Sequence, residues 1–242
     1  MRFIGCTFLA FSCLVAFSAA NPALLAPIRT FSQNGTLVPQ SNFALELKGV
    51  IRQIPNGQIE KLVQTYLLND PEFQSLIRAI NSIPAYQFYR QLLNQPEVRQ
   101  LQQWIYQQII LSGGSPKIFE YLELEIKIFN KYPYWSQIVN GVSGFQSELV
   151  QIYPVELIRS LLEPSASQTS AQLSELWRRL VALKPVYERI LATPAGKAIV
   201  TELQRLGVDV GGLDALIRYQ FGWSNVTLAA QFSNYNYYSY GY

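Results

Sequence analysis

Apolar residues recur every three or four positions through the body of the chain, and alternation with a period of two is rare. This spacing places the apolar side chains on one face of a helix, so it predicts an all-α fold built from amphipathic helices. The clearest runs are Ile59, Leu62, Val63 and Tyr66; Phe73, Leu76, Ile77 and Ile80; Val98, Leu101 and Ile105; and Leu173, Leu176, Trp177 and Leu180.

Prolines punctuate this pattern at short intervals. Proline is tolerated in the first turn of a helix but breaks a helix interior, so each one predicts a helix start. They are Pro55, Pro71, Pro84, Pro96, Pro116, Pro133, Pro154, Pro185 and Pro194. Asp70, Ser115 and Thr193 precede three of them as candidate N-caps, and Glu72 adds a favourable charge to a first turn. We expect about twelve short helices of roughly ten to sixteen residues each.

The order of the helices indicates an internal duplication with a shift of about one hundred residues. Three blocks recur in the same order: Gln53-Ile54-Pro55 as Gln151-Ile152-Tyr153-Pro154, Leu76-Ile77-Arg78-Ala79-Ile80 as Leu176-Trp177-Arg178-Arg179-Leu180, and Leu92-Leu93-Asn94-Gln95-Pro96 as Ile190-Leu191-Ala192-Thr193-Pro194. We place helical repeat 1 at residues 41–132 and helical repeat 2 at 133–223. Chance similarity between amphipathic helices is the alternative.

The N-terminal segment has the pattern of a secretory signal peptide. A basic Met1-Arg2 start precedes an apolar run from Phe3 to Phe17, and small residues end it at Ser18-Ala19-Ala20. We therefore expect residues 1–20 to be removed, residues 21–40 to form an N-terminal extension, and the protein to be secreted into the extracellular space. No later run is long enough for a stable transmembrane anchor. Asn34 and Asn225 begin N-glycosylation sequons, which fits the secretory route.

Composition narrows the chemistry that we expect. The chain has 49% apolar and 14% charged residues and a net charge of +3, which gives no support to nucleic acid as a partner. It contains no histidine, and its cysteines, Cys6 and Cys13, lie in the predicted signal peptide. A serine motif at 141–144 is followed by Phe145 and fails the nucleophile-elbow pattern. Glu120 and Glu123 fit the solvated face of a helix better than a catalytic pair. We expect no catalytic, cofactor-binding or metal-binding residues, and no enzyme.

Several blocks resemble the insect allergen repeat, the family of the cockroach group 1 allergen, insect microvillar midgut proteins and nitrile-specifier proteins. The resemblance spans about residues 41–223 and rests on the order of loose apolar motifs. They are Ile54-Pro55 with the helix from Ile59 to Leu68, Asn69-Asp70-Pro71-Glu72-Phe73-Gln74, Ile83-Pro84, Leu203-Gln204-Arg205-Leu206-Gly207-Val208-Asp209-Val210, Leu213, Ile217 and Phe221-Gly222. The chain departs from the family pattern in the loop from Pro164 to Ser170 and in its tail.

The resemblance implies an all-helical capsule of two tandem repeats around a large apolar cavity that holds fatty acids or similar apolar lipids. It also implies a secreted protein of the gut lumen or microvillar surface, related to digestion. Each apolar stripe could equally be ordinary core. The candidate lipid-cavity residues are Leu62, Tyr66, Phe73, Leu76, Ile80, Phe88, Leu92, Leu101, Ile105, Leu122, Ile158, Leu162, Leu176, Leu180, Ile190, Ile199, Leu203, Leu213 and Ile217.

Tyrosines raise two further questions. Tyr66, Tyr86, Tyr89, Tyr106, Tyr187 and Tyr219 either supply polar ends near lipid head groups or keep their hydroxyls bonded within the protein. Residues 224–242 form a Tyr- and Asn-rich tail that we expect to be disordered. An alternative function for the protein is contact, through this tail, with an extracellular matrix such as cuticle, gut lining or eggshell. A third alternative, from the family resemblance, is a nitrile-specifier-like detoxification factor.

Overall fold

The computed structural model describes residues 42–115, 117–119, 139–164 and 170–224. Within these ranges the regular structure is α-helix with one short 3₁₀ turn at 117–119, and there is no strand, so the predicted all-α class is confirmed. The helices are α2 (Phe43–Ile51), α3 (Asn56–Asn69), α4 (Pro71–Ile80), α5 (Ile83–Leu93), α6 (Pro96–Leu111), α7 (Gly141–Ile152), α8 (Val155–Leu162), α9 (Ala171–Val181), α10 (Lys184–Ala192), α11 (Pro194–Arg205) and α12 (Val210–Gln220).

Helix starts follow the proline pattern. Proline is the first residue of α4, α6 and α11, and Pro55 and Pro154 occupy the N-cap positions of α3 and α8. The predicted N-caps Asp70 and Thr193 are confirmed, because each side chain accepts a backbone N–H of the helix that follows. Ser115 differs, since its hydroxyl accepts the N–H of Lys117 at 3.3 Å and caps only the short 3₁₀ turn.

Asp70 supplies the most complete of these caps. Its Oδ1 accepts the N–H groups of Glu72 at 2.8 Å and Phe73 at 3.0 Å, and the side chain is buried. We expect Asp70→Ala to lower the free energy of unfolding by about 1–2 kcal/mol, because two first-turn N–H groups lose their acceptor. Urea unfolding followed by circular dichroism measures the loss. Asp70→Asn retains an amide oxygen at the cap and should lose much less; equal losses would contradict the capping role.

Some helices are shorter than the pattern predicted. α8 has 8 residues, and α2 and α10 have 9 each. α8 is bounded by Pro154 and Pro164, which explains its length, because proline does not continue a helix interior. α2 and α10 are each one residue shorter than the lower end of the predicted range.

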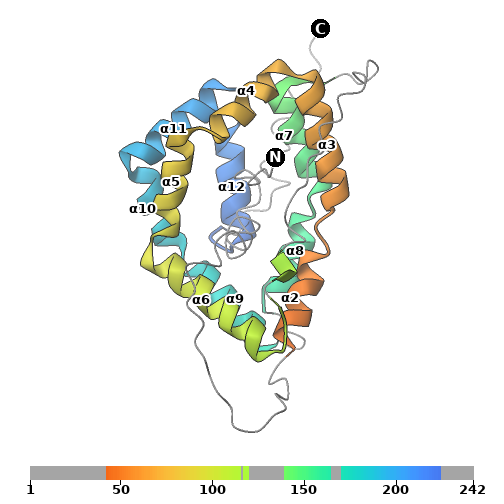
Figure 1. The fold of residues 1–242 in the computed structure, drawn as a ribbon, viewed down its shortest axis with the longest axis vertical. Coiled ribbons are helices and arrows are strands. Elements are labelled where there is room, and N and C mark those ends of the chain that lie inside the picture. The colour runs from red at the N-terminus through yellow and green to blue at the C-terminus, as the bar shows by residue number, and fades with distance from the viewer. Residues whose placement is uncertain (1–41, 116, 120–138, 165–169, 225–242) are drawn as a thin grey trace.

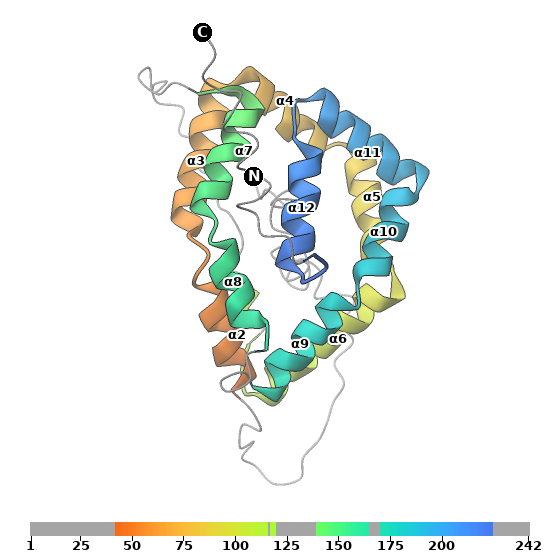
Figure 2. The same cartoon turned by 180° about the vertical axis from the view of Figure 1, so that it is seen from behind.

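The helices form an elongated ring, seen from both sides in Figures 1 and 2. Along much of this ring the wall is a pair of helices drawn from the two halves of the chain. α3 contacts α7, α2 contacts α8, α6 contacts α9, and α5 contacts α11. The last helix, α12, contacts α8 and α11. None of the described helices is long and apolar enough to cross a membrane.

The buried apolar side chains form one cluster that reaches both halves of the chain. One of its centres joins Tyr66, Phe73 and Phe145, whose ring centroids lie 4.4–5.7 Å apart across α3, α4 and α7. The stripes predicted on α3, α6 and α9 are buried throughout, whereas Ile77 and Ile80 of α4 are half-buried. α5 contributes no fully buried residue, and α11 contributes only Gly196.

Candidate apolar binding site

Most of the predicted cavity residues lie in the buried cluster. It includes Leu62, Tyr66, Phe73, Leu76, Leu101, Ile105, Ile158, Leu162, Leu176, Leu180, Leu213 and Ile217. Ile80, Leu92 and Leu203 are partly buried and pack against it, while Ile190 is buried outside the cluster. Phe88 and Ile199 are half-buried and do not join it. Leu122 lies outside the described residues, as do Glu120, Glu123, Asn34, Asn225 and the predicted signal peptide.

Three helices that contact one another, α4, α5 and α11, share a set of half-buried apolar residues. We call this set the half-buried wall, and its members are Ile77, Ile80, Phe88, Leu92, Ile199 and Leu203. Their side chains keep accessible apolar surface, although the same spacing elsewhere in the chain produces full burial. The half-buried wall is therefore one part of the described fold where apolar surface stays accessible, and Leu45 of α2 and Leu157 of α8 are apolar residues that are exposed elsewhere.

Three of the tyrosines predicted as head-group contacts bond instead to carboxylates of the protein. The hydroxyl of Tyr66 donates to Glu148 at 2.6 Å, that of Tyr187 donates to Asp214 at 2.8 Å, and that of Tyr219 donates to Glu156. Burial, with the hydrogen bond to Glu148, raises the pKa of Tyr66 to about 12. The pKa of Tyr187 is raised by burial and by the charge of Asp214. These three hydroxyls therefore connect neighbouring helices. Of the two predicted roles, they have the one in which the hydroxyl is bonded within the protein.

Arg159 of α8 is a buried cation that holds the end of α12. Its Nη1 donates to the carbonyl oxygens of Tyr219 at 3.0 Å and Ser224 at 3.1 Å, and its Nε donates to Glu163 at 2.9 Å. The guanidinium carbon also lies 4.3 Å from the ring centroid of Tyr219. Because Arg159 bonds both the last turn of α12 and the segment that follows it, this side chain fixes the position of α12 against α8.

A groove of about 570 Å³ opens on the surface beside α2. Its lining combines apolar side chains with two lysines: Ala44, Leu45, Lys48, Gly114, Ser115, Lys117 and Ile118. The sequence pattern did not indicate it, because its walls come from segments separated by about 70 positions, and helical periodicity relates only near neighbours in the chain. No group of three or more acidic, cysteine or histidine side chains able to hold a metal occurs within the described ranges.

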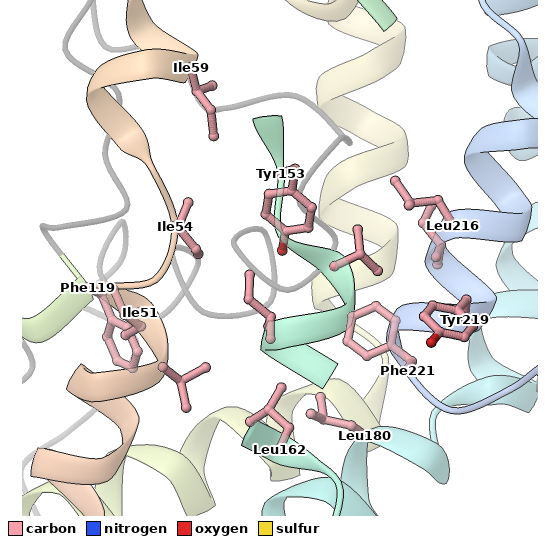
Figure 3. Close-up of a cluster of buried hydrophobic side chains, with 14 of the residues drawn as sticks. Ile51, Ile54, Ile59, Phe119, Tyr153, Leu162, Leu180, Leu216, Tyr219 and Phe221 are labelled. Atoms are coloured by element: carbon pink, nitrogen blue, oxygen red, sulfur yellow. The ribbon is translucent and has the colours of Figure 1, made fainter. Parts of the chain in front are cut away.

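Two polar side chains in the interior were missed by the sequence analysis. Tyr153 is 6% exposed, and its burial raises the pKa of its hydroxyl. Figure 3 shows it between Ile54 on one side and Leu216 of α12 on the other. Gln220 is 4% exposed, and neither atom of its amide has a partner among the described residues. The sequence pattern could have indicated Gln220. It follows Ile217 by three positions and Leu216 by four, so it occupies a position of the apolar stripe where an apolar residue is expected.

Comparison with known proteins adds one match. A family model described as "Insect allergen related repeat, nitrile-specifier detoxification" matches residues 42–214, from the start of α2 into α12. A comparison with curated proteins finds no match. The matched range contains the half-buried wall, Tyr153 and Arg159, and it ends shortly before Gln220.

Proposed function

The chain belongs to the insect allergen related repeat family, and from this premise we propose that it is a secreted, non-enzymatic carrier of fatty acids or similar apolar molecules. The site of carriage is the apolar interior of the helical ring, and its accessible part is the half-buried wall. A digestive role at the gut lumen or microvillar surface fits the resemblance from which the proposal began.

The half-buried wall is the observation that carries this proposal. Its six residues come from α4 and α5 in the first half of the chain and from α11 in the second, and each keeps part of its apolar surface accessible. Covering apolar surface is worth about 25 cal/mol per Å², and each buried methylene of a ligand adds roughly 0.8 kcal/mol. An acyl chain laid along these helices therefore gains binding energy without any specific polar contact.

The pairing of helices supports a duplicated architecture for this carrier. If α2 and α3 of the first half correspond to α7 and α8 of the second, the α3–α7 contact has its counterpart in the α2–α8 contact. The same exchange relates α4–α7 to α2–α9 and α6–α9 to α4–α11. Two copies packed about an approximate two-fold axis produce such reciprocal contacts. An interior enclosed by both repeats then needs both copies to form.

If acyl chains are bound through apolar contacts alone, the carrier should accept chains of many lengths. We also expect no side chain of the site to take part in a reaction. The hydroxyls of Tyr66, Tyr187 and Tyr219 are already bonded to carboxylates, and burial raises the pKa of Tyr66 and Tyr187, so these phenols stay protonated at neutral pH. A phenol with a raised pKa is a poor general base under those conditions. These groups therefore serve packing and helix joining in the carrier.

Native mass spectrometry of the secreted full chain, followed by extraction and identification of lipids, tests the proposal. We expect several acyl chains per protein, released only when the protein unfolds. Phe88→Asn should lower the affinity for an acyl chain by about tenfold, because an unpartnered amide against the ligand costs about 1–3 kcal/mol. Ile83→Asp is the matched control, since Ile83 lies on the same helix and is 73% exposed.

Two outcomes contradict the carrier function. One is a folded protein, verified by circular dichroism, that contains no lipid and binds none when acyl chains are supplied. The other is equal loss of affinity in Phe88→Asn and Ile83→Asp, which would show that the half-buried wall does not contact the ligand.

The family description favours a nitrile-specifier detoxification factor as a second candidate. Such a factor steers the spontaneous breakdown of a small plant toxin toward one product. Product ratios measured with and without the purified chain test this directly, and a ratio that does not change contradicts it. The matrix role rests on the tail beyond Ser224, outside the described residues, and stays a prediction.

A further inference from the structure

We propose that Gln220 is a recognition residue for the polar end of the bound molecule, and that this end is an uncharged hydroxyl group, as in a long-chain alcohol. The inference rests on the proposed carrier function and adds a ligand class to it. Gln220 is the last residue of α12, and its side chain is among the few buried polar ones in the described ranges.

The position of Gln220 places it on the interior face of its helix. Residues three, four and seven positions apart lie on one face, and Ile217, Leu216 and Leu213 are all buried there. Leu216 belongs to the apolar cluster around Tyr153 that Figure 3 draws. One helical turn beyond Leu216, the same face presents the amide of Gln220 in place of an aliphatic side chain.

An amide in this position needs partners that the described residues do not supply. Both its Oε1 and its Nε2 are buried and make no hydrogen bond with any described residue. Buried polar side-chain atoms in folded proteins are bonded in the large majority of cases, because leaving them unpaired forfeits their interaction with water. A ligand group that both donates and accepts satisfies the two atoms together, and a hydroxyl has these two capacities.

The charges near the end of α12 are already paired with protein groups, and the amide of Gln220 itself selects a hydroxyl over a carboxylate. Arg159 bonds the carbonyl oxygen of Tyr219, which is the peptide group next to Gln220, and its positive charge is matched by Glu163 at 2.9 Å. Glu156 accepts the hydroxyl of Tyr219 and adds a second negative charge. A carboxylate only accepts hydrogen bonds and would leave Oε1 of Gln220 unpaired, whereas a hydroxyl donates to Oε1 and accepts from Nε2.

Displacement of aminoanthracene fluorescence from the delipidated full chain measures the preference. The competitors are dodecanol, dodecane and dodecanoate at neutral pH. We expect dodecanol to bind about tenfold more tightly than dodecane, and more tightly than dodecanoate, because only the alcohol pairs with both atoms of the amide. Gln220→Leu should remove the preference for dodecanol while dodecane binds as well as before or better.

The matched control is Gln204→Leu, which removes an exposed amide from α11 and should leave the preference for the alcohol unchanged. Gln220→Met, which keeps the length of the side chain, repeats the test if the leucine variant fails to fold. We expect both Gln220 variants to be at least as stable to heat as the parent chain, since an unpaired buried amide is removed.

The outcomes separate this inference from the carrier function. Equal binding of dodecanol and dodecane by the parent chain, or a preference that persists in both Gln220 variants, overturns the role of Gln220 and leaves the carrier intact. Tightest binding of dodecanoate overturns the hydroxyl assignment. If none of the three displaces the probe and none binds directly, the carrier function and the role of Gln220 both fail.

Discussion

Phe73→Ala is expected to lower the free energy of unfolding by about 3–5 kcal/mol, the range found when a buried aromatic side chain is truncated. Phe73 is 1% exposed and lies at the first turn of α4. Its ring centroid is 4.4 Å from that of Phe145 and 5.7 Å from that of Tyr66. Truncation removes two aromatic contacts at once and leaves a cavity where three helices meet, because the surrounding helices relax only in part.

Urea unfolding followed by circular dichroism measures this loss. Tyr86→Ala is the matched control, because Tyr86 is an aromatic residue on the neighbouring helix α5 that is 52% exposed. We expect a loss of less than about 1 kcal/mol there. Similar losses in the two variants would contradict the placement of Phe73 at the centre of the core.

Arg159→Ala is expected to lower the free energy of unfolding by about 3 kcal/mol, since hydrogen bonds to charged groups contribute roughly 1.5–3 kcal/mol and the ring contacts add to them. The variant removes the guanidinium donor from the carbonyl oxygens of Tyr219 and Ser224, although Tyr219 keeps the N–H of Gly222. Because Tyr219 lies in the last turn of α12 and Ser224 follows the helix, we expect the loss to appear first as local opening of α12. Hydrogen exchange of the α12 amides measures that opening.

Arg178→Ala provides the control for Arg159. Arg178 makes an ion pair with Glu175 at 2.7 Å, but its side chain is 68% exposed, so water screens the interaction. Exposed pairs of this kind contribute about 0–1 kcal/mol. A stability loss in Arg178→Ala as large as that in Arg159→Ala, or unchanged exchange of α12 in Arg159→Ala, would contradict the anchoring role of Arg159.

Phe73→Ala and Arg159→Ala should affect different properties of ligand binding. Phe73 belongs to the fully buried cluster, whereas Gln220 lies directly after the peptide group that Arg159 holds. If Gln220 recognises a hydroxyl end, Arg159→Ala should also weaken the preference for an alcohol over an alkane, because α12 no longer presents the amide at a fixed position. Phe73→Ala should change overall affinity without changing that preference.

Local features of the chain were predictable because they depend on near neighbours in the sequence. Asp70 and Thr193 cap their helices as expected, since an N-cap needs only a side-chain acceptor two or three residues before an unpaired N–H. The buried stripe of Ile59, Leu62, Val63 and Tyr66 followed from the helical period alone. The 8-residue length of α8 depends instead on its flanking prolines, Pro154 and Pro164, because proline does not continue a helix interior.

The candidate site was predictable only as a set of apolar faces. α5 carries as regular a stripe as α3, yet its apolar residues are at most half-buried, because burial depends on which helix lies opposite. The carboxylate partners of the tyrosines could not be predicted from local sequence either. Tyr66 and Glu148 are 82 positions apart, so no local pattern connects them. Gln220 was visible as a polar residue in an apolar stripe, but its lack of partners depends on every segment packed around it.

Three features were therefore predictable from local sequence: the helical class, the helix starts and the side of each helix that avoids water. They follow from backbone geometry and from the helical period over a few residues. Which apolar surface is covered, which hydroxyls are bonded and which buried amide is left unpaired became known from the folded chain. Burial and hydrogen-bond satisfaction depend on residues that folding brings together from distant parts of the chain.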